Sequence, residues 1–125
     1  MSPKKNPTIL LVDDDKDMCE SLADVLTLDS EYQVEYTTEP YKAVEMAKQA
    51  DFTLAIIDYK MPEMNGIELL KRLKQARPEL SVFILTAFIS HELIEQAKKE
   101  GADRVLSKFI WPDEILKYIK QTLGE

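Results

Sequence analysis

The sequence predicts one α/β domain in which helices cover both faces of a parallel β-sheet. Three observations support this prediction. The chain has 125 residues, a common size for a single domain. Short apolar runs alternate along it with longer amphipathic segments, and no linker, repeat or low-complexity stretch interrupts the alternation. Strictly alternating strands and helices imply parallel strands joined by right-handed crossovers, so we expect residues 1–125 to form a single doubly wound domain.

Five short runs are predicted to be β-strands. They are Thr8 to Val12 (TILLV), Gln33 to Thr37 (QVEYT), Leu54 to Asp58 (LAIID), Ser81 to Thr86 (SVFILT) and Arg104 to Ser107 (RVLS). The first, third and fourth runs are apolar along their length, as central strands buried on both faces should be. The second run alternates polar and apolar residues, which suits an edge strand.

Five amphipathic segments between these runs are predicted to be helices. They are Lys16 to Leu28, Pro40 to Gln49, Gly66 to Arg77, His91 to Glu100 and Pro112 to Leu123. Pro40 and Pro112 suit the first turn of a helix, and Pro78 follows a helix end. Gly101 fits a left-handed cap after the fourth helix.

Composition restricts the classes of function. Hydrophobic residues make up 45% of the chain and charged residues 31%, which is typical of a globular protein. Sixteen basic and twenty-three acidic residues give a net charge of -7, which repels phosphate backbones. The single cysteine, Cys19, cannot form an internal disulfide, and no apolar run approaches the length that spans a bilayer. We therefore expect a cytoplasmic protein that contacts neither nucleic acid nor membrane directly.

The third predicted strand ends a buried hydrophobic run on a carboxylate, Asp58. Doubly wound sheets bind ligands outside the carboxyl ends of their strands, so Asp58 would emerge at the functional rim of the fold. Other strands deliver polar residues to the same rim: Asp13 and Asp14 after the first, Thr86 at the end of the fourth and Lys108 after the fifth. Each residue alone has an ordinary structural explanation, but their convergence on one rim indicates a site.

These residue types suit the binding of a phosphoryl group. Carboxylates held a few ångströms apart repel one another unless protons or a cation bind, and Mg²⁺ prefers one or two carboxylates together with water and phosphoryl oxygens. A phosphoryl group in such a site needs a nucleophile, a metal ion on its oxygens, and cationic or hydroxyl donors. Asp58 could supply the nucleophile and Asp14 a metal ligand. Lys108 and Thr86 could supply the donors, whereas the neighbouring Asp15 is equally suited to capping the following helix.

The motifs ILLVDDD, DYKMPEMNGIELL, FILTAF and GADRVLSK resemble those of the receiver domains of two-component response regulators. They follow the order and spacing of that family, and the resemblance covers essentially the whole chain. It implies a flavodoxin-like fold, a (βα)5 sandwich whose five parallel strands lie in the order 2-1-3-4-5.

The resemblance also implies a phosphoacceptor and its metal site. Asp58 would accept a phosphoryl group from a histidine kinase and form an acyl phosphate. Asp13 and Asp14 match the family's acidic pair, with Asp14 binding Mg²⁺ directly and Asp13 acting largely through water. Asp58 itself and the backbone carbonyl of Lys60 would complete the metal ligands.

A switch is implied as well. Thr86 matches the hydroxyl that moves toward the phosphoryl group, and Lys108 matches the lysine that pairs with it. Phosphorylation would then change the surface formed by the fourth helix, fifth strand and fifth helix. This surface would serve a downstream protein, an output domain or a homodimer. Pro62 and Gly66 would shape the loop after the phosphoacceptor, Gly66 by adopting a backbone conformation closed to other residues.

Two positions near the switch depart from the family's pattern. Receivers usually carry an aromatic residue where this chain has Val105, so we expect Phe88, or the backbone of its loop, to couple the movement of Thr86 to the surface. The family also usually follows Lys108 with a cis proline, but Phe109 stands here. A non-proline cis bond costs about 3 kcal/mol. Either the fold supports such a bond or Lys108 is held less firmly.

Two further features surround the predicted site. Lys60 lies two residues after Asp58 and could shield an acyl phosphate from water, which predicts slow self-dephosphorylation; a solvated loop lysine is the alternative. The run Phe109, Ile110 and Trp111 precedes the last helix. We expect Ile110 to pack into the core, and the others could form an exposed patch for a partner.

Two alternative functions remain open. Asp13 and Asp15 superficially make the D-x-D pair of haloacid dehalogenase-like phosphohydrolases, but Lys16 and Asp17 stand where that class needs threonine or valine. The second alternative is a pseudo-receiver that serves only as a docking module. The intact set of candidate site residues argues against it.

Overall fold

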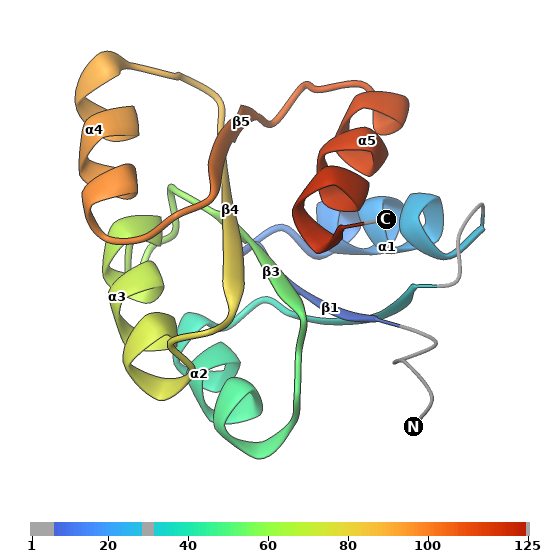
Figure 1. The fold of residues 1–125 in the computed structure, drawn as a ribbon, viewed down its shortest axis with the longest axis horizontal. Coiled ribbons are helices and arrows are strands. Elements are labelled where there is room, and N and C mark those ends of the chain that lie inside the picture. The colour runs from blue at the N-terminus through green and yellow to red at the C-terminus, as the bar shows by residue number, and fades with distance from the viewer. Residues whose placement is uncertain (1–6, 29–31, 125) are drawn as a thin grey trace.

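The computed structural model describes residues 7–28 and 32–124, which form one five-stranded parallel sheet with helices on both faces (Figure 1). The strands are β1 (Thr8–Val12), β2 (Gln33–Thr37), β3 (Leu54–Asp58), β4 (Ser81–Thr86) and β5 (Arg104–Ser107). The helices are α1 (Lys16–Leu28), α2 (Pro40–Gln49), α3 (Gly66–Ala76), α4 (His91–Lys99) and α5 (Pro112–Leu123). The strand order is β2-β1-β3-β4-β5, so the predicted doubly wound, flavodoxin-like fold is confirmed.

The core lies in two layers, one on each face of the sheet. Side chains at alternate positions of the central strands point to opposite faces. One layer joins the sheet to α2, α3 and α4, and the other joins it to α1 and α5. Every residue of β3 is buried, because this strand has a neighbouring strand on each side and a helical layer on each face.

Two helices end one residue earlier than predicted. α3 ends at Ala76 because Arg77 has left the helical conformation, with φ -141° and ψ 87°. The Arg77 guanidinium instead donates to the carbonyl oxygens of Ala47 (2.8 Å) and Lys48 (3.2 Å), and so satisfies the last turn of α2. α4 ends at Lys99, and Gly101 follows with φ +101°, the positive φ that was predicted.

The winding of the chain reverses at β1. α1 carries the chain from β1 to β2 over one face, and α2 carries it from β2 to β3 over the other face. The carboxyl ends of β1 and β3 therefore flank the topological switch point, where folds of this type place their sites. Among the described residues, no helix combines the length and the apolar character needed to cross a membrane.

Gly66 closes the loop after β3 for a reason that differs from the prediction. Within the described residues only Gly101 and Gly124 have positive φ, so Gly66 does not adopt a conformation closed to other residues. Glycine is needed at this position because neighbouring backbone atoms leave no space for a side chain. A Cβ at this position would lie 2.8 Å from the Tyr59 Cα and 2.9 Å from the Asp58 carbonyl oxygen. The Gly66 N–H also donates to the Tyr59 carbonyl at 2.7 Å, which fixes the loop against the end of β3.

We predict that Gly66→Ala lowers the free energy of unfolding by about 1–3 kcal/mol, because the added methyl group must displace backbone atoms. Urea denaturation would measure the loss. Gln75→Ala, on the exposed side of the same helix, is the control and should change stability by less than about 0.5 kcal/mol. Equal effects of the two substitutions would contradict the close packing at Gly66.

Candidate functional site

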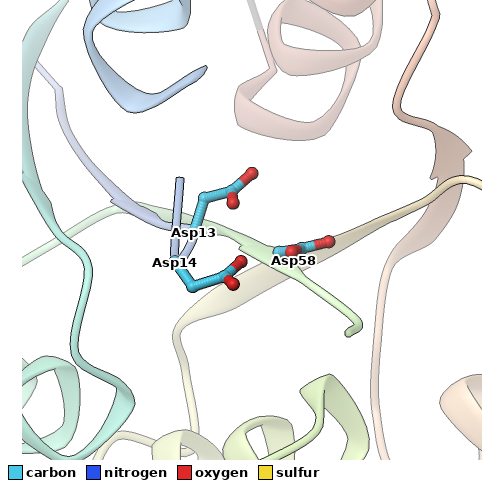
Figure 2. A group of neighbouring side chains, drawn as sticks. All are labelled: Asp13, Asp14 and Asp58. Atoms are coloured by element: carbon cyan, nitrogen blue, oxygen red, sulfur yellow. The ribbon is translucent and has the colours of Figure 1, made fainter. Parts of the chain in front are cut away.

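Three carboxylates gather at the switch point (Figure 2). Asp13 and Asp14 follow β1, and Asp58 ends β3. Each offers an oxygen, and these oxygens all lie within 4.8 Å of one another. Asp13 and Asp58 are buried, whereas Asp14 is exposed and faces the approach from solvent. The structure thus brings together the three acids that the sequence predicted, in an arrangement that could bind a metal ion.

Lys108 supplies the positive charge of this cluster. Its Nζ lies 3.2 Å from Asp13 Oδ2 and 3.4 Å from Asp58 Oδ2. Its backbone N–H donates to the Thr86 carbonyl at 2.9 Å, which extends the pairing of β4 and β5 beyond the strand ends. No peptide bond in residues 7–28 and 32–124 is cis, so the bond to Phe109 is trans. The side chain of Lys108 nevertheless reaches both carboxylates.

Burial and mutual repulsion govern the protonation of the acids. Burial, followed by the negative charge of Asp13, raises the pKa of Asp58 to about 6, although Lys108 opposes the rise. Burial also raises the pKa of Asp13. Burial alone would lower the pKa of Lys108, but the attraction of the two carboxylates outweighs it and the pKa rises. Lys108 pairs with Asp13 and Asp58, two of the three carboxylates, so one ammonium group does not balance the negative charge of the cluster.

Thr86 ends β4 beside this cluster and is almost completely buried. In the sheet it pairs with Ser107, the residue before Lys108, so both predicted donors lie on adjacent strands. The Thr86 hydroxyl accepts the Phe88 N–H and donates to the Phe88 carbonyl oxygen, each at 3.2 Å. Thr86 is therefore at the predicted place, with its hydroxyl engaged by the loop that leads to α4.

Other predicted residues have simpler positions. Asp15 Oδ1 accepts the N–H groups of Asp17 (3.0 Å) and Met18 (3.4 Å), so it caps α1 and is not part of the carboxylate cluster. Lys60 is exposed in the loop after β3. Ile110 packs against the core layer of α1 and α5, as predicted.

The large apolar side chains that were predicted to form a hydrophobic patch are exposed in loops at the same rim. Phe109 and Trp111 are 78% and 73% exposed, and Phe88 in the neighbouring loop is 87% exposed. Because β4 and β5 are adjacent and in register, the loops that carry these rings leave the sheet side by side.

Cys19 is a neighbour of the site that the sequence prediction missed. Its thiol donates to the Asp13 carbonyl oxygen at 3.4 Å, and burial raises the pKa of the thiol to about 11. The thiol therefore stays protonated near neutral pH and supports the backbone of Asp13 through this hydrogen bond. The helical spacing of Cys19, Leu22 and Leu26 is the signal that could have placed it on the inner face of α1.

Comparison with known proteins decides the family. The family model described as the response regulator receiver domain matches residues 9–120. The chain belongs to this family. The phosphohydrolase alternative loses its support, because the receiver match spans the chain and Asp15 is occupied in capping.

Individual relatives agree with the assignment of a receiver domain. The chain is 32% identical over 107 residues to a response regulator receiver protein of Anaeromyxobacter sp. (strain Fw109-5), covering 86% of this chain and 44% of the relative. A CheY-like receiver domain protein from Methanospirillum hungatei JF-1 superposes with a TM-score of 0.90 at 30% identity, covering 96% of this chain and 95% of the other.

A third relative is a response regulator from Burkholderia pseudomallei whose crystal structure contains a phosphorylated aspartic acid, a calcium ion and citrate. It superposes with a TM-score of 0.82 at 26% identity, over 89% of this chain and 65% of that chain. The receiver domain described here spans about half or less of the length of the curated relatives that it matches.

We predict that Asp58→Asn stabilises the metal-free receiver domain at pH 7.5 by about 1–3 kcal/mol, because a carboxyl with a pKa of about 6 must ionise in a buried site. The folded pKa lies above the ordinary 3.8, so the stability that protonated Asp58 contributes is complete below pH 4 and is lost as the pH rises to 6. The gain should therefore largely disappear at pH 4.

Urea unfolding in EDTA at the two pH values would measure this effect. Asp24→Asn, on the exposed face of α1, is the matched control and should show no such difference between the two pH values. A gain for Asp58→Asn that is the same at both pH values would show that ionisation of Asp58 is not its cause.

Proposed function

We propose that this receiver domain is a phosphoacceptor in two-component signalling, in which Asp58 takes a phosphoryl group from a histidine kinase in the presence of Mg²⁺. One observation carries the proposal. Asp58 is a buried carboxylate at the end of a central strand, with an ammonium group at 3.4 Å and two further carboxylates around it. A purely structural role does not explain so costly a concentration of charge.

The chemistry follows from the placement of these groups. An oxygen of Asp58 attacks the phosphorus atom of a phosphohistidine, the phosphorus–nitrogen bond breaks, and its electron pair stays on the imidazole, which takes up a proton. Lys108 already lies beside the attacking carboxylate and neutralises charge on the phosphoryl oxygens. Thr86 has a hydroxyl donor at the adjacent strand end.

The acidic cluster fits a divalent cation. Three carboxylate oxygens within 4.8 Å of one another repel, and the raised pKa of Asp58 records part of that repulsion. Asp14 and Asp58 would bind Mg²⁺ directly, Asp13 largely through water, and Lys60 through its backbone carbonyl. When bound, the ion supplies positive charge to the phosphoryl oxygens. The phosphorylated aspartic acid and calcium ion in the Burkholderia pseudomallei relative support this assignment.

The output of the domain is a changed surface and not a catalytic product. Phosphorylation adds about 1.5–2 negative charges at Asp58, which draws Thr86 and Lys108 inward and shifts the equilibrium between two arrangements of α4, β5 and α5. This surface would contact a downstream protein, an output domain of a longer regulator or a second copy of the chain. The paired Lys108 and the acidic cluster favour this switch over a docking module that is never phosphorylated.

Acetyl phosphate tests the proposal without a kinase. With Mg²⁺ present, we expect intact mass spectrometry to show one added phosphoryl group on the parent protein and none on Asp58→Asn. EDTA should abolish the modification, because the repulsion between the acids is then left uncompensated. Asp24→Asn, an exposed acid outside the cluster, should be modified like the parent. Modification of Asp58→Asn to the same extent as the parent would reject Asp58 as the acceptor.

Lys60 provides a test of the lifetime of the acyl phosphate. We expect Lys60→Ala to shorten the half-life of the phosphorylated domain severalfold, because a long side chain two residues after Asp58 hinders the attacking water. Lys60→Met keeps the length without the charge and separates shielding from electrostatics. The decay of purified phosphorylated protein in EDTA, followed by mass spectrometry, gives the rates. Identical half-lives for the parent and both variants would assign Lys60 to the solvated loop.

A further inference from the structure

Asn65 and Gly66 are a pair of residues whose side-chain and backbone groups can react with each other. The backbone nitrogen that follows an asparagine can attack the side-chain amide, and a glycine nitrogen is the least obstructed because glycine has no side chain. The sequence has one other asparagine, Asn6, and Pro7 after it has no N–H to provide the nucleophile. Asn65 is therefore the asparagine of this chain that can deamidate by this route.

The reaction has two steps. The Gly66 nitrogen gives its proton to a solvent base and bonds to Asn65 Cγ, while the bond between Cγ and the amide nitrogen breaks and ammonia leaves with a proton from water. The product is a cyclic imide, which water then opens. Cleavage of the bond from Gly66 N to Cγ gives aspartate. Cleavage of the bond from Gly66 N to the backbone carbonyl carbon gives isoaspartate, in which the main chain runs through Cβ and Cγ.

The folded loop engages both reacting groups in hydrogen bonds. The Gly66 N–H donates to the Tyr59 carbonyl at 2.7 Å, the short end of the range for such bonds, so the nucleophile does not readily lose its proton. Asn65 caps α3: its Oδ1 accepts the Glu68 N–H at 3.0 Å, and its backbone carbonyl accepts the Leu69 N–H at 3.1 Å. Formation of the imide ring moves both groups, so it requires the loop to open.

Access of water does not limit the reaction. The side chain of Asn65 is exposed, so solvent already reaches its amide. What limits the reaction is the opening of residues 59–66, which connect β3 to α3. Segments of this kind open locally, with free energies below that of global unfolding. The rate of deamidation therefore reports how often this loop opens.

The two products differ in their effect on the loop. Aspartate caps a helix about as well as asparagine, and its charge is favourable at the N-terminus of α3. Isoaspartate adds one carbon atom, about 1.5 Å, to the main chain. The loop has no space for it, because even a Cβ on Gly66 would lie 2.8 Å from the Tyr59 Cα. The same loop follows Asp58 directly and contains Lys60, whose carbonyl is a proposed ligand of Mg²⁺.

We propose that Asn65–Gly66 is a deamidation site that the folded loop keeps closed, and that its isoaspartyl product disables the phosphoacceptor whereas its aspartyl product does not. The modification runs in one direction, because ammonia is lost to solvent. It marks those molecules whose loop has opened. The part that concerns the phosphoacceptor rests on the proposed function, because it is measured as phosphorylation of Asp58.

Peptide mapping by mass spectrometry tests the protection by the fold, at mildly alkaline pH in native buffer and in concentrated guanidinium chloride. Trypsin releases residues 61–71 as one peptide, and deamidation raises its mass by the difference between water and ammonia. A synthetic peptide of these residues gives the intrinsic rate in each solvent. Relative to this peptide, we expect deamidation of the folded protein to be at least about tenfold slower, because only open loops react.

Two results of this mapping would overturn the proposal. The first is a folded protein that deamidates as fast as the peptide in native buffer. The second is an unfolded protein that does not deamidate at Asn65.

A second experiment tests the effect on phosphorylation. Protein deamidated in guanidinium chloride is refolded, treated with acetyl phosphate and Mg²⁺, and separated into phosphorylated and unphosphorylated fractions on a phosphate-affinity gel. We expect isoaspartate at position 65 to be enriched severalfold in the unphosphorylated fraction, because its longer main chain displaces the loop. Aspartate arises in the same sample and is the matched control, so it should be divided like intact asparagine. Equal distribution of isoaspartate would overturn the proposal.

Substitutions at position 65 separate charge from the length of the main chain. Asn65→Ser keeps a capping oxygen without an amide, so the same treatment in guanidinium chloride should not reduce its phosphorylation. Freshly prepared Asn65→Asp should be phosphorylated like the parent, and loss in this variant would overturn the assignment of the effect to isoaspartate. Failure of the untreated parent to be phosphorylated would refute the proposed function, whereas the mapping experiment would still decide whether the fold protects Asn65.

Discussion

The burial of one carboxylate at the end of a central strand is the constraint on which the rest of this structure depends. Asp58 is 3% exposed, and burial is the main reason that its pKa rises to about 6. A charge in such a place is tolerated only with compensation, and Lys108 supplies part of it at 3.4 Å. The fold thus maintains an unfavourable concentration of charge at one point, which is a property of functional sites rather than of stable cores.

The helices that follow Asp58 and Thr86 differ in how many side chains they bury. α3, which begins directly after the Asp58 loop, buries Ile67, Leu69, Leu70 and Leu73 and starts at a glycine pressed against the Tyr59 backbone. α4, which follows Thr86, buries two side chains. α3 is therefore anchored by more buried side chains than α4.

Most of the fold could be predicted, because the strands and helices follow from patterns among residues that are close together in the sequence. The burial pattern of β3 and the alternation in β2 can be read from neighbouring residues, and all five strands have the predicted bounds. Two details were predicted incorrectly. α3 stops at Ala76 because Arg77 precedes Pro78 and leaves the helical conformation, and the Arg77 guanidinium then donates to the carbonyls at the end of α2. Gly66 is required by the nearness of backbone on the other side of its loop and not by its own φ.

For the candidate site, too, the sequence and the tertiary structure supplied different information. The sequence by itself determined which residues meet at the rim, because strand ends in a parallel sheet share one edge and the motifs place Asp13, Asp58 and Lys108 at those ends. Only the tertiary structure decided how they interact. The contact of Lys108 with Asp13 and the raised pKa of Asp58 both depend on distances between segments far apart in the chain, and such distances are set by packing.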